Sequence, residues 1–425
     1  MSPADGGATV RAPPHRSSAW SSSRKAWPGR KRCWGAPAPE FRVVVVGLSY
    51  GGLDAQIWRG FNRFRLGGAR WVVRNAGHNR EYLDRELSLR PDGIPANVTD
   101  ADLAQRLARL GAPVVDFSGF FRLPGLHLVG VDNRAVGEMG ARHLLERGYR
   151  RFLFVSTGDR PFERQRWEGF AARLAAEGLG AQWVQVQACR SLDEGGRPTD
   201  LVRPGEDVWE CLGRVERPLA VLAAYDAAAM LVCENCHRRG LAVPEQVALL
   251  GVDDFAEICE AALVPLSSVR LAGEKMGFDG AGALDALMRG LDPPHASPHL
   301  VPPVGVRERR SKNASAIADQ PVARALAFIR EHAAERINVA DVMAYVHLDR
   351  RTLNRRFRAV VGRTPLASIY RARAEAAAAR LADSDAKVAR IAAECGFRDA
   401  KLMTAHFRRQ FGLTPTEYRR QFRLT

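Results

Sequence analysis

The sequence contains no run of about 18 apolar residues, the length that a helix needs to cross a bilayer. Residues 1–40 also lack the apolar segment of a secretory signal peptide, because they are rich in Ser, Pro, Gly, Ala and Arg. These absences argue against a membrane protein and against a secreted one. We therefore expect a cytoplasmic protein, and we interpret residues 1–40 as a disordered tail.

Cysteine is scarce as well, with 7 in 425 residues. The seven are scattered and odd in number, so they do not form the framework of a disulfide-rich domain. Cys233 and Cys236 make a single CxxC, but the second ligand pair of a structural zinc site is missing. We predict neither a metal site nor a cofactor.

Charge is unevenly distributed along the chain, whose net charge is +16. Residues 310–425 carry 23 Lys and Arg against 11 Asp and Glu, whereas residues 41–309 carry 33 against 34. A basic block beside a neutral body predicts that the block alone binds a polyanion such as nucleic acid.

Residues 41–311 alternate short apolar runs with amphipathic stretches. The candidate strands are 41–46, 113–118, 126–131, 151–156, 219–224 and 247–252. Helical patterns lie between them, for example at 134–147 and 161–177. Apolar strands that alternate with helices are typical of parallel sheets covered on both faces. The length exceeds what one sheet usually needs, so we expect an α/β domain with two lobes.

Polar residues follow three of these strands, and ligands bind beyond the carboxyl ends of the strands in such sheets. Tyr50 follows the first strand, and Asp226 and Asp253 follow the last two. A carboxylate can accept hydrogen bonds from two hydroxyl groups, so these positions suggest a sugar site. The alternative is that each aspartate caps the next helix. The nearby GLSYGG at 47–52 is not GxGxxG, and it does not favour a dinucleotide site.

Residues 319–425 contain an internal repeat. The apolar pattern of 339–346 returns 49 residues later at 388–395. A second pattern, Leu353, Phe357, Gly362, Thr364 and Pro365, recurs 50 residues on as Met403, Phe407, Gly412, Thr414 and Pro415. The repeat predicts two helix-turn-helix units joined by a helix at 364–383. That helix, about 28 Å long at ~1.5 Å per residue, can hold two readers near the ~34 Å spacing of successive major grooves.

The second helix of each unit begins after an aspartate, Asp349 or Asp399, that can cap it. In the first unit the polar face of this helix presents Arg350, Arg351, Asn354, Arg355 and Arg358, with no acidic residue among them. Arginine can bind guanine and asparagine can bind adenine in the major groove. The alternative is a solvated charged face, but its place inside a repeated motif favours DNA reading.

Several motifs in the α/β segment resemble the effector domain of the lactose-repressor family, which is similar in fold to periplasmic sugar-binding proteins. They are the run at 131–155, RQRWEGF at 164–170, AAYDAAA at 223–229 and VPEQVALLGVDDF at 243–255. The resemblance implies a bilobed domain with ligand contacts from Arg166, Asp226, Asp253 and the aromatic Phe162, and from Asn97 and Tyr50 of the first lobe. That family's own DNA-binding headpiece is absent from 1–40.

The C-terminal segment resembles the AraC-type DNA-binding domain. The resemblance is carried by RTLNRRF at 351–357, Arg373, Ala377 and Leu381 in an RxxxAxxL pattern, IAAECGF at 391–397 and HFRRQFGLTPTEYR at 406–419. It implies DNA contacts from Arg350, Arg351, Asn354 and Arg355 in the first unit and from Lys401, Leu402, Thr404 and Arg408 in the second. Ala405 stands where that family often has arginine, so we expect the second unit to contact mainly phosphate.

The sequence therefore predicts a bilobed α/β domain (41–311), a linker (312–318) and an all-α domain with two helix-turn-helix motifs (319–425). We expect a homodimeric transcription activator that binds operator DNA, contacts RNA polymerase and responds to a sugar. The resemblance to sugar-operon regulators of this domain order favours a pentose such as D-xylose. The alternatives are a different ligand, a degenerate sensor, or a sugar enzyme with a fused DNA domain; no nucleophile–base pair or phosphate loop supports the last.

Overall fold

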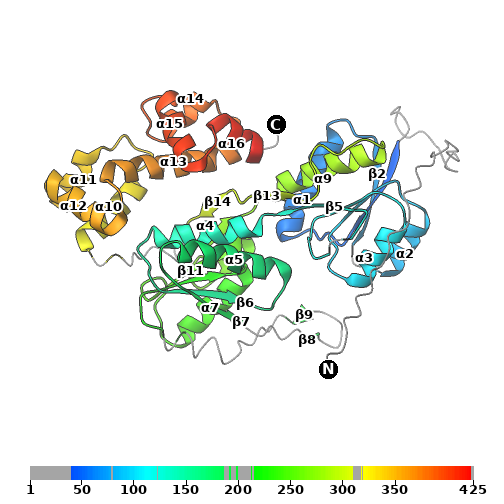
Figure 1. The fold of residues 1–425 in the computed structure, drawn as a ribbon, viewed down its shortest axis with the longest axis horizontal. Helices are drawn as coiled ribbons and strands as arrows, with labels where there is room; N and C mark the ends of the chain where they lie inside the picture. The colour runs from blue at the N-terminus through cyan, green and yellow to red at the C-terminus, as the bar shows by residue number, and fades with distance from the viewer. Residues whose placement is uncertain are drawn as a thin grey trace, which may run out of the picture. The chain divides into compact units, whose positions relative to one another are not determined.

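The computed structural model describes most of the chain from residue 40 onward (Figure 1). The described residues are 40–77, 80–121, 123–185, 191–192, 198–199, 212, 215–309, 317 and 319–422. The tail predicted at 1–40 lies outside them except for its last residue, and so does most of the predicted linker.

The first half of the α/β domain is built on a six-stranded sheet in the order β13-β5-β4-β3-β1-β2, in which all neighbours run parallel. Its strands are β1 (Phe41–Val46), β2 (Trp71–Gly77), β3 (Ile94–Ala96), β4 (Val114–Asp116), β5 (Leu126–Val131) and β13 (His299–Val301). Helices α1 (Gly52–Leu66) and α9 (Gly273–Met288) cover one face, and α2 (Arg80–Ser88) and α3 (Ala101–Arg109) cover the other (Figure 1).

Strand β1 is apolar along its length because both of its faces are buried. Val43 and Val45 pack with α1 and α9, whereas Val44 and Val46 pack with α2 and α3. Helices α1 and α9 approach so closely that a Cβ on Gly277 would lie 1.9 Å from the carbonyl oxygen of Ile57. Only glycine fits this contact.

The second half contains a sheet in the order β14-β12-β11-β10-β6-β7, parallel except where β14 joins β12. Its strands are β6 (Phe152–Ser156), β7 (Gln182–Gln185), β10 (Leu219–Ala223), β11 (Val247–Asp253), β12 (Ser267–Arg270) and β14 (Gly305–Arg307). Helices α4 (Asn133–Leu145) and α5 (Pro161–Ala175) cover one face, and α7 (Asp226–Arg238) and α8 (Ala256–Ala261) the other. A small separate pair joins β8 (Ser191–Leu192) to β9 (Pro198–Thr199).

The chain passes between the two sheets three times, from β5 to α4, from β12 to α9, and from β13 to β14. The predicted fold class, a two-sheet α/β domain followed by a helical one, is confirmed. The predicted strands at 41–46 and 126–131 have the observed bounds of β1 and β5.

The C-terminal segment contains two similar helical units on either side of a long helix, α13 (Pro365–Asp383). The first unit contains α10 (Gln320–Glu331), α11 (Val339–Val346) and α12 (Arg350–Val361), and the second contains α14 (Val388–Glu394), α15 (Ala400–Phe411) and α16 (Pro415–Phe422). Gly362 and Gly412 end α12 and α15 in the left-handed conformation, at φ +71° and +72°. None of the helices described between residues 40 and 422 has both the length and the apolarity to cross a membrane.

Candidate functional site

Arg166 and Asp253 form a charged pair at the carboxyl ends of the second sheet's strands. Arg166 lies on α5 and is only 4% exposed. Its Nε donates to Oδ1 of Asn133 at 2.9 Å, its Nη1 donates to the Ala224 carbonyl, and its Nη2 lies 3.5 Å from Oδ1 of Asp253. Burial lowers the pKa of Arg166, although the nearby carboxylates oppose that shift.

Asp253 ends β11 in an unusual backbone conformation. Its φ is +107° and that of Asp254 is +55°. At such values the backbone of any residue other than glycine is strained by about 1–3 kcal/mol. Burial raises the pKa of the Asp253 carboxyl, and the charge of Arg166 only partly offsets this. The side chain of Asp253 nevertheless stays 30% exposed. Asp253 is therefore the more accessible partner of the pair, held in a strained turn.

Asp226, by contrast, is buried behind this turn. Its Oδ2 accepts from the Phe255 backbone N–H at 2.7 Å, and its Oδ1 accepts from the Ser268 hydroxyl at 2.6 Å. The alternative that each aspartate caps the next helix is wrong here, because the N-cap residues of α7 and α8 are Tyr225 and Phe255. Asp226 instead fixes the turn that carries Asp253, and a direct contact with ligand stays a prediction.

Aromatic rings gather beside the pair. The ring of Phe162 lies 6.4 Å from that of Tyr225 and 6.2 Å from that of Phe120. The guanidinium groups of Arg166 and Arg160 lie 5.0 and 5.4 Å from the Phe162 ring centroid. Apolar faces with a few fixed polar groups are typical of small-molecule sites.

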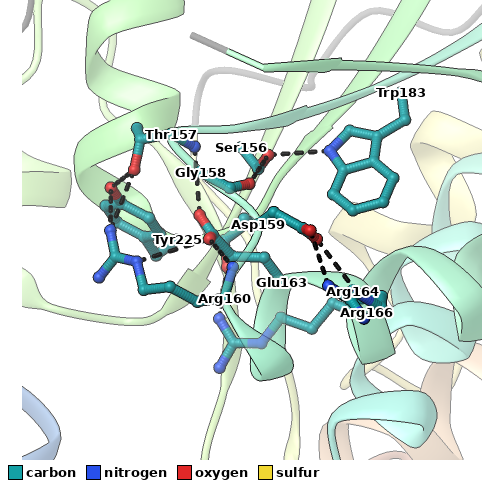
Figure 2. A network of polar contacts seen from close by, with 11 residues as sticks. Ser156, Thr157, Gly158, Asp159, Arg160, Glu163, Arg164, Arg166, Trp183 and Tyr225 are labelled. Atoms are coloured by element: carbon teal, nitrogen blue, oxygen red, sulfur yellow. Dashed lines mark hydrogen bonds and ion pairs between the residues drawn. The ribbon is translucent and has the colours of Figure 1, made fainter. Parts of the chain in front are cut away.

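A polar network that sequence reasoning missed holds the loop after β6 (Figure 2). The Glu163 carboxylate accepts from the backbone N–H groups of Thr157 and Arg160 at 3.1 and 3.0 Å. The Arg160 guanidinium donates to the Thr157 hydroxyl at 3.1 Å, and that hydroxyl also contacts the Tyr225 hydroxyl. The available signal was Glu163 at the third position of a helix that starts with Pro161, a capping-box pattern.

In the first half, Tyr50 and Asn97 lie at the ends of neighbouring strands β1 and β3. Asn97 donates its side-chain amide to Oδ1 of Asp54 at 3.3 Å, and the Tyr50 hydroxyl accepts from Asn75 at 2.9 Å. Tyr50 is 77% exposed and stacks on Trp58. The partners Asp54 and Asn75 were not predicted.

A cavity of about 430 Å³ lies where the two halves meet the C-terminal helices. It is lined by Gln56 of α1, by Asp253 and Arg270 of the second sheet, and by Asp383 of α13 and Phe422 of α16. Arg166 and Phe162 do not line it, so this cavity joins Asp253 to α13 and is not the space beside the aromatic rings.

Helices α12 and α15, the second helices of the two repeated units, are capped by Asp349 and Asp399, as predicted from the sequence. Asp349 accepts from the backbone N–H groups of Arg351 and Thr352 at 2.9 and 3.0 Å, and Asp399 accepts from that of Leu402 at 2.7 Å. The Thr352 side chain and then these backbone N–H groups lower the pKa of the Asp349 carboxyl, and the Leu402 N–H and then the Arg398 side chain lower that of Asp399. Both caps are therefore charged at neutral pH.

The two helices present the same face to solvent. The pattern of buried and exposed positions over 351–360 is repeated without change over 401–410. Leu353 and Phe357 point into one core, and Met403 and Phe407 into the other. Arg350, Arg351, Arg355 and Arg358 are exposed, and no ion pair to another described side chain holds them. Asn354 is half-buried and donates to the Arg350 carbonyl.

In α15 the exposed side is less basic near its start. Lys401, Ala405 and Arg408 are exposed, whereas Leu402 and Thr404 are half-buried. Thr404 donates its hydroxyl to the Ala400 carbonyl at 2.8 Å, and Leu402 packs against the core. Lys401, Thr404, Ala405, Arg408 and Arg409 line a shallow surface depression.

Arg373 of α13 anchors the first unit. It is 6% exposed and donates to the carbonyl oxygens of Ala333, Glu335 and Ile337 at 3.2, 2.9 and 2.8 Å. These three acceptors form the loop between α10 and α11, so Arg373 fixes the first unit on the connecting helix.

Comparison with known proteins identifies two domain models. Residues 141–312 match a periplasmic binding protein-like domain, and residues 342–421 match a helix-turn-helix domain. The xylose operon regulatory protein of Escherichia coli (strain K12) is 28% identical over 387 residues, which cover 89% of this chain and 96% of that protein. That of Haemophilus influenzae is 27% identical and covers 80% and 87%. A solved structure of a xylose-binding transcription activator is 26% identical, with a TM-score of 0.56, and covers 89% of this chain and 98% of that one.

Proposed function

From the premise that this chain is a transcription regulator in which a periplasmic-binding-protein-like domain precedes an AraC-type helix-turn-helix domain, we propose that it senses a neutral monosaccharide and binds operator DNA through α12 and α15. The sugar-sensing part of this proposal is supported by the Arg166–Asp253 pair beside Phe162. A pair of opposite charges with free hydrogen-bonding capacity suits hydroxyl groups better than a net anion.

D-xylose is the sugar we favour. The relatives that align over nearly the whole chain are named for the xylose operon. In this proposal Asp253 and the side-chain carbonyl of Asn97, from the first half, accept from hydroxyls, and Arg160 and Arg166 donate to them. An uncharged pentose needs both kinds of partner and no excess of cations.

The coupling between sugar and DNA starts, in this proposal, at the strained turn. Asp254, next to Asp253, pairs with Arg309 at 2.8 Å and with Arg307 at 3.2 Å. Arg270 lies 3.6 Å from Asp254 and forms an ion pair with Asp383, the last residue of α13, at 2.7 Å. A ligand that binds one arrangement of this turn better than another shifts the position of α13 through these contacts.

In this proposal α12 contacts DNA. Its exposed Arg351 and Arg355 and its half-buried Asn354 read bases, and Arg350 adds charge. In α15, Lys401 and Arg408 bind phosphate, and Leu402 and Thr404 make the smaller base contacts. We further propose that the protein acts in the cytoplasm as a homodimeric activator that contacts RNA polymerase, and that it converts no substrate.

The proposal is tested by titrating the full-length protein with D-xylose, other pentoses and their phosphates in a calorimeter, and by gel shift with operator DNA with and without the best ligand. We expect saturable binding of a neutral pentose that changes DNA affinity. Tighter binding of a sugar phosphate would overturn the neutral-sugar proposal. Binding of no sugar at all, with intact DNA binding, would identify a degenerate sensor, and turnover of the sugar would identify an enzyme.

A further inference from the structure

A histidine-rich cluster lies in the first half of the α/β domain, apart from Arg166 and Asp253. Asp279 of α9, His295 and His299 each offer one ligand atom, and these atoms lie within 4.8 Å of one another. Nε2 of His299 is 2.9 Å from Oδ2 of Asp279, and the rings of His295 and His299 stack at 4.0 Å. The proposed function uses none of these residues.

His127 of β5 adds an independent observation. It is 8% exposed, and its Nε2 is buried with no hydrogen-bond partner among the described residues. Strands β5 and β13 run parallel with His299 opposite Val129, and His127 lies two residues before Val129, so His127 and His299 project from the same face of the sheet. Helix α9, which carries Asp279, packs on β5 on that face. A buried imidazole nitrogen without a partner is costly unless something binds it.

We propose that Asp279, His295 and His299, with His127 close by, form a binding site for a divalent transition-metal cation of the Zn²⁺ class. Two imidazoles and one carboxylate are a ligand set that Zn²⁺, Co²⁺ and Ni²⁺ prefer, whereas Mg²⁺ and Ca²⁺ prefer oxygen ligands alone. No metal site was predicted from the sequence. His295 and His299 are only four positions apart, but Asp279 and His127 come near them only through the fold.

Among the residues that the structure describes, Lys275 is the cation in contact with this cluster that could oppose a metal. It pairs with Oδ1 of Asp279, on the opposite carboxylate oxygen from the one that His299 contacts. A carboxylate that binds a metal through one oxygen commonly keeps a hydrogen bond on the other. Lys275 can therefore orient Asp279 through Oδ1. When the cation binds, Oδ2 contacts the cation and gives up its present hydrogen bond with His299.

The test titrates the tag-free, chelator-treated full-length protein with ZnCl₂ in a calorimeter. We expect one Zn²⁺ per chain, a rise in melting temperature, and affinity that falls more than about 10-fold in His299→Gln and in His295→Gln. The matched control is His237→Gln, an exposed histidine beside Cys233 and Cys236, and it should bind Zn²⁺ like the wild type.

Three results would overturn the site: no saturable Zn²⁺ binding by the wild type, full affinity in a folded His295→Gln/His299→Gln double variant, or loss of binding in His237→Gln. Should the double variant not fold, the wild type loaded with Co²⁺ decides. A visible spectrum without thiolate-to-metal charge transfer supports the histidine cluster, and a thiolate band assigns the metal to the cysteines instead.

Discussion

Replacing Asp253 with asparagine keeps the shape of the side chain and removes its charge. A hydrogen bond to a charged group is worth about 1.5–3 kcal/mol and a neutral one about 0.5–1.5 kcal/mol. The difference of roughly 1–1.5 kcal/mol predicts that Asp253→Asn weakens pentose binding about fivefold to tenfold at neutral pH. Asp253→Ala, which removes the acceptor altogether, should weaken binding from roughly tenfold to over a hundredfold.

The pH dependence gives this prediction a direction. Burial raises the pKa of Asp253, so acidification from about pH 7.5 to about pH 5 protonates it earlier than an ordinary aspartate of pKa about 3.9. The neutral sugar does not titrate, so wild-type affinity should fall over this window as the carboxylate is lost. Asp253→Asn should show a flatter profile.

Without ligand, the contribution of Asp253 to the free energy of unfolding should change with pH in the opposite direction from the sugar affinity. A carboxyl whose folded-state pKa is raised favours the folded state below its unfolded pKa and loses that contribution as the pH rises through the folded pKa. The difference in melting temperature between wild type and Asp253→Asn should therefore shift against the wild type as pH rises over the same window. Calorimetric titration and thermal melts measure both trends.

Asp102→Asn, on the exposed surface of α3, serves as the control and should leave affinity and its pH profile unchanged. Unchanged affinity in a folded Asp253→Asn protein at neutral pH, with a wild-type pH profile, would remove Asp253 from the site. The reasoning from the Arg166 pair would then be wrong.

Three further predictions concern DNA binding, coupling and packing. Arg351→Ala or Arg355→Ala should cost about 1–3 kcal/mol at the specific operator and relax preference at one base pair in gel shifts, whereas an equal loss on random DNA would show phosphate contacts instead. Arg270→Ala should leave sugar affinity and DNA affinity separately close to wild type and reduce the effect of sugar on DNA binding, measured by gel shift with and without ligand; an unchanged effect would exclude this path. Gly277→Ala should lower the melting temperature, because its methyl group meets the Ile57 carbonyl, while Gly290→Ala at the end of α9 provides a comparison with open space around the Cβ but a positive φ.

The sequence was sufficient to predict the helices and strands that depend on residues close together in the chain. The run at 41–46 reads as a strand because both faces of β1 are buried, and the helices of both C-terminal units follow from apolar spacing, a capping aspartate and a closing glycine. Strand β2 was missed because Arg74 and Asn75 interrupt its apolar residues at the edge of the sheet. Strand β12 was missed because it is short and begins with two serines whose burial depends on distant partners.

The site was predictable only in part. Arg166 and Asp253 came from motif resemblance, and the structure brings them to 3.5 Å. The orientation of Asp226 could not be predicted, because it depends on Ser268 and on Gly251, where a Cβ would lie 2.2 Å from Oδ1 of Asp226. The roles of Arg160 and Arg373 depend likewise on contacts with distant parts of the chain, because Arg160 reaches the Tyr225 hydroxyl and Arg373 reaches the Ala333 carbonyl.

Helices α12 and α15, which we propose contact DNA, share one exposure pattern but differ in composition. At the equivalent positions where α12 exposes Arg351 and Arg355, α15 exposes Lys401 and Ala405. A methyl group cannot distinguish most base pairs, so the operator's information content should be concentrated in one half of each protomer's footprint. Bound sequences selected from a random pool should give a motif with several strongly conserved base pairs on one side and, about one helical turn away, a stretch close to random composition.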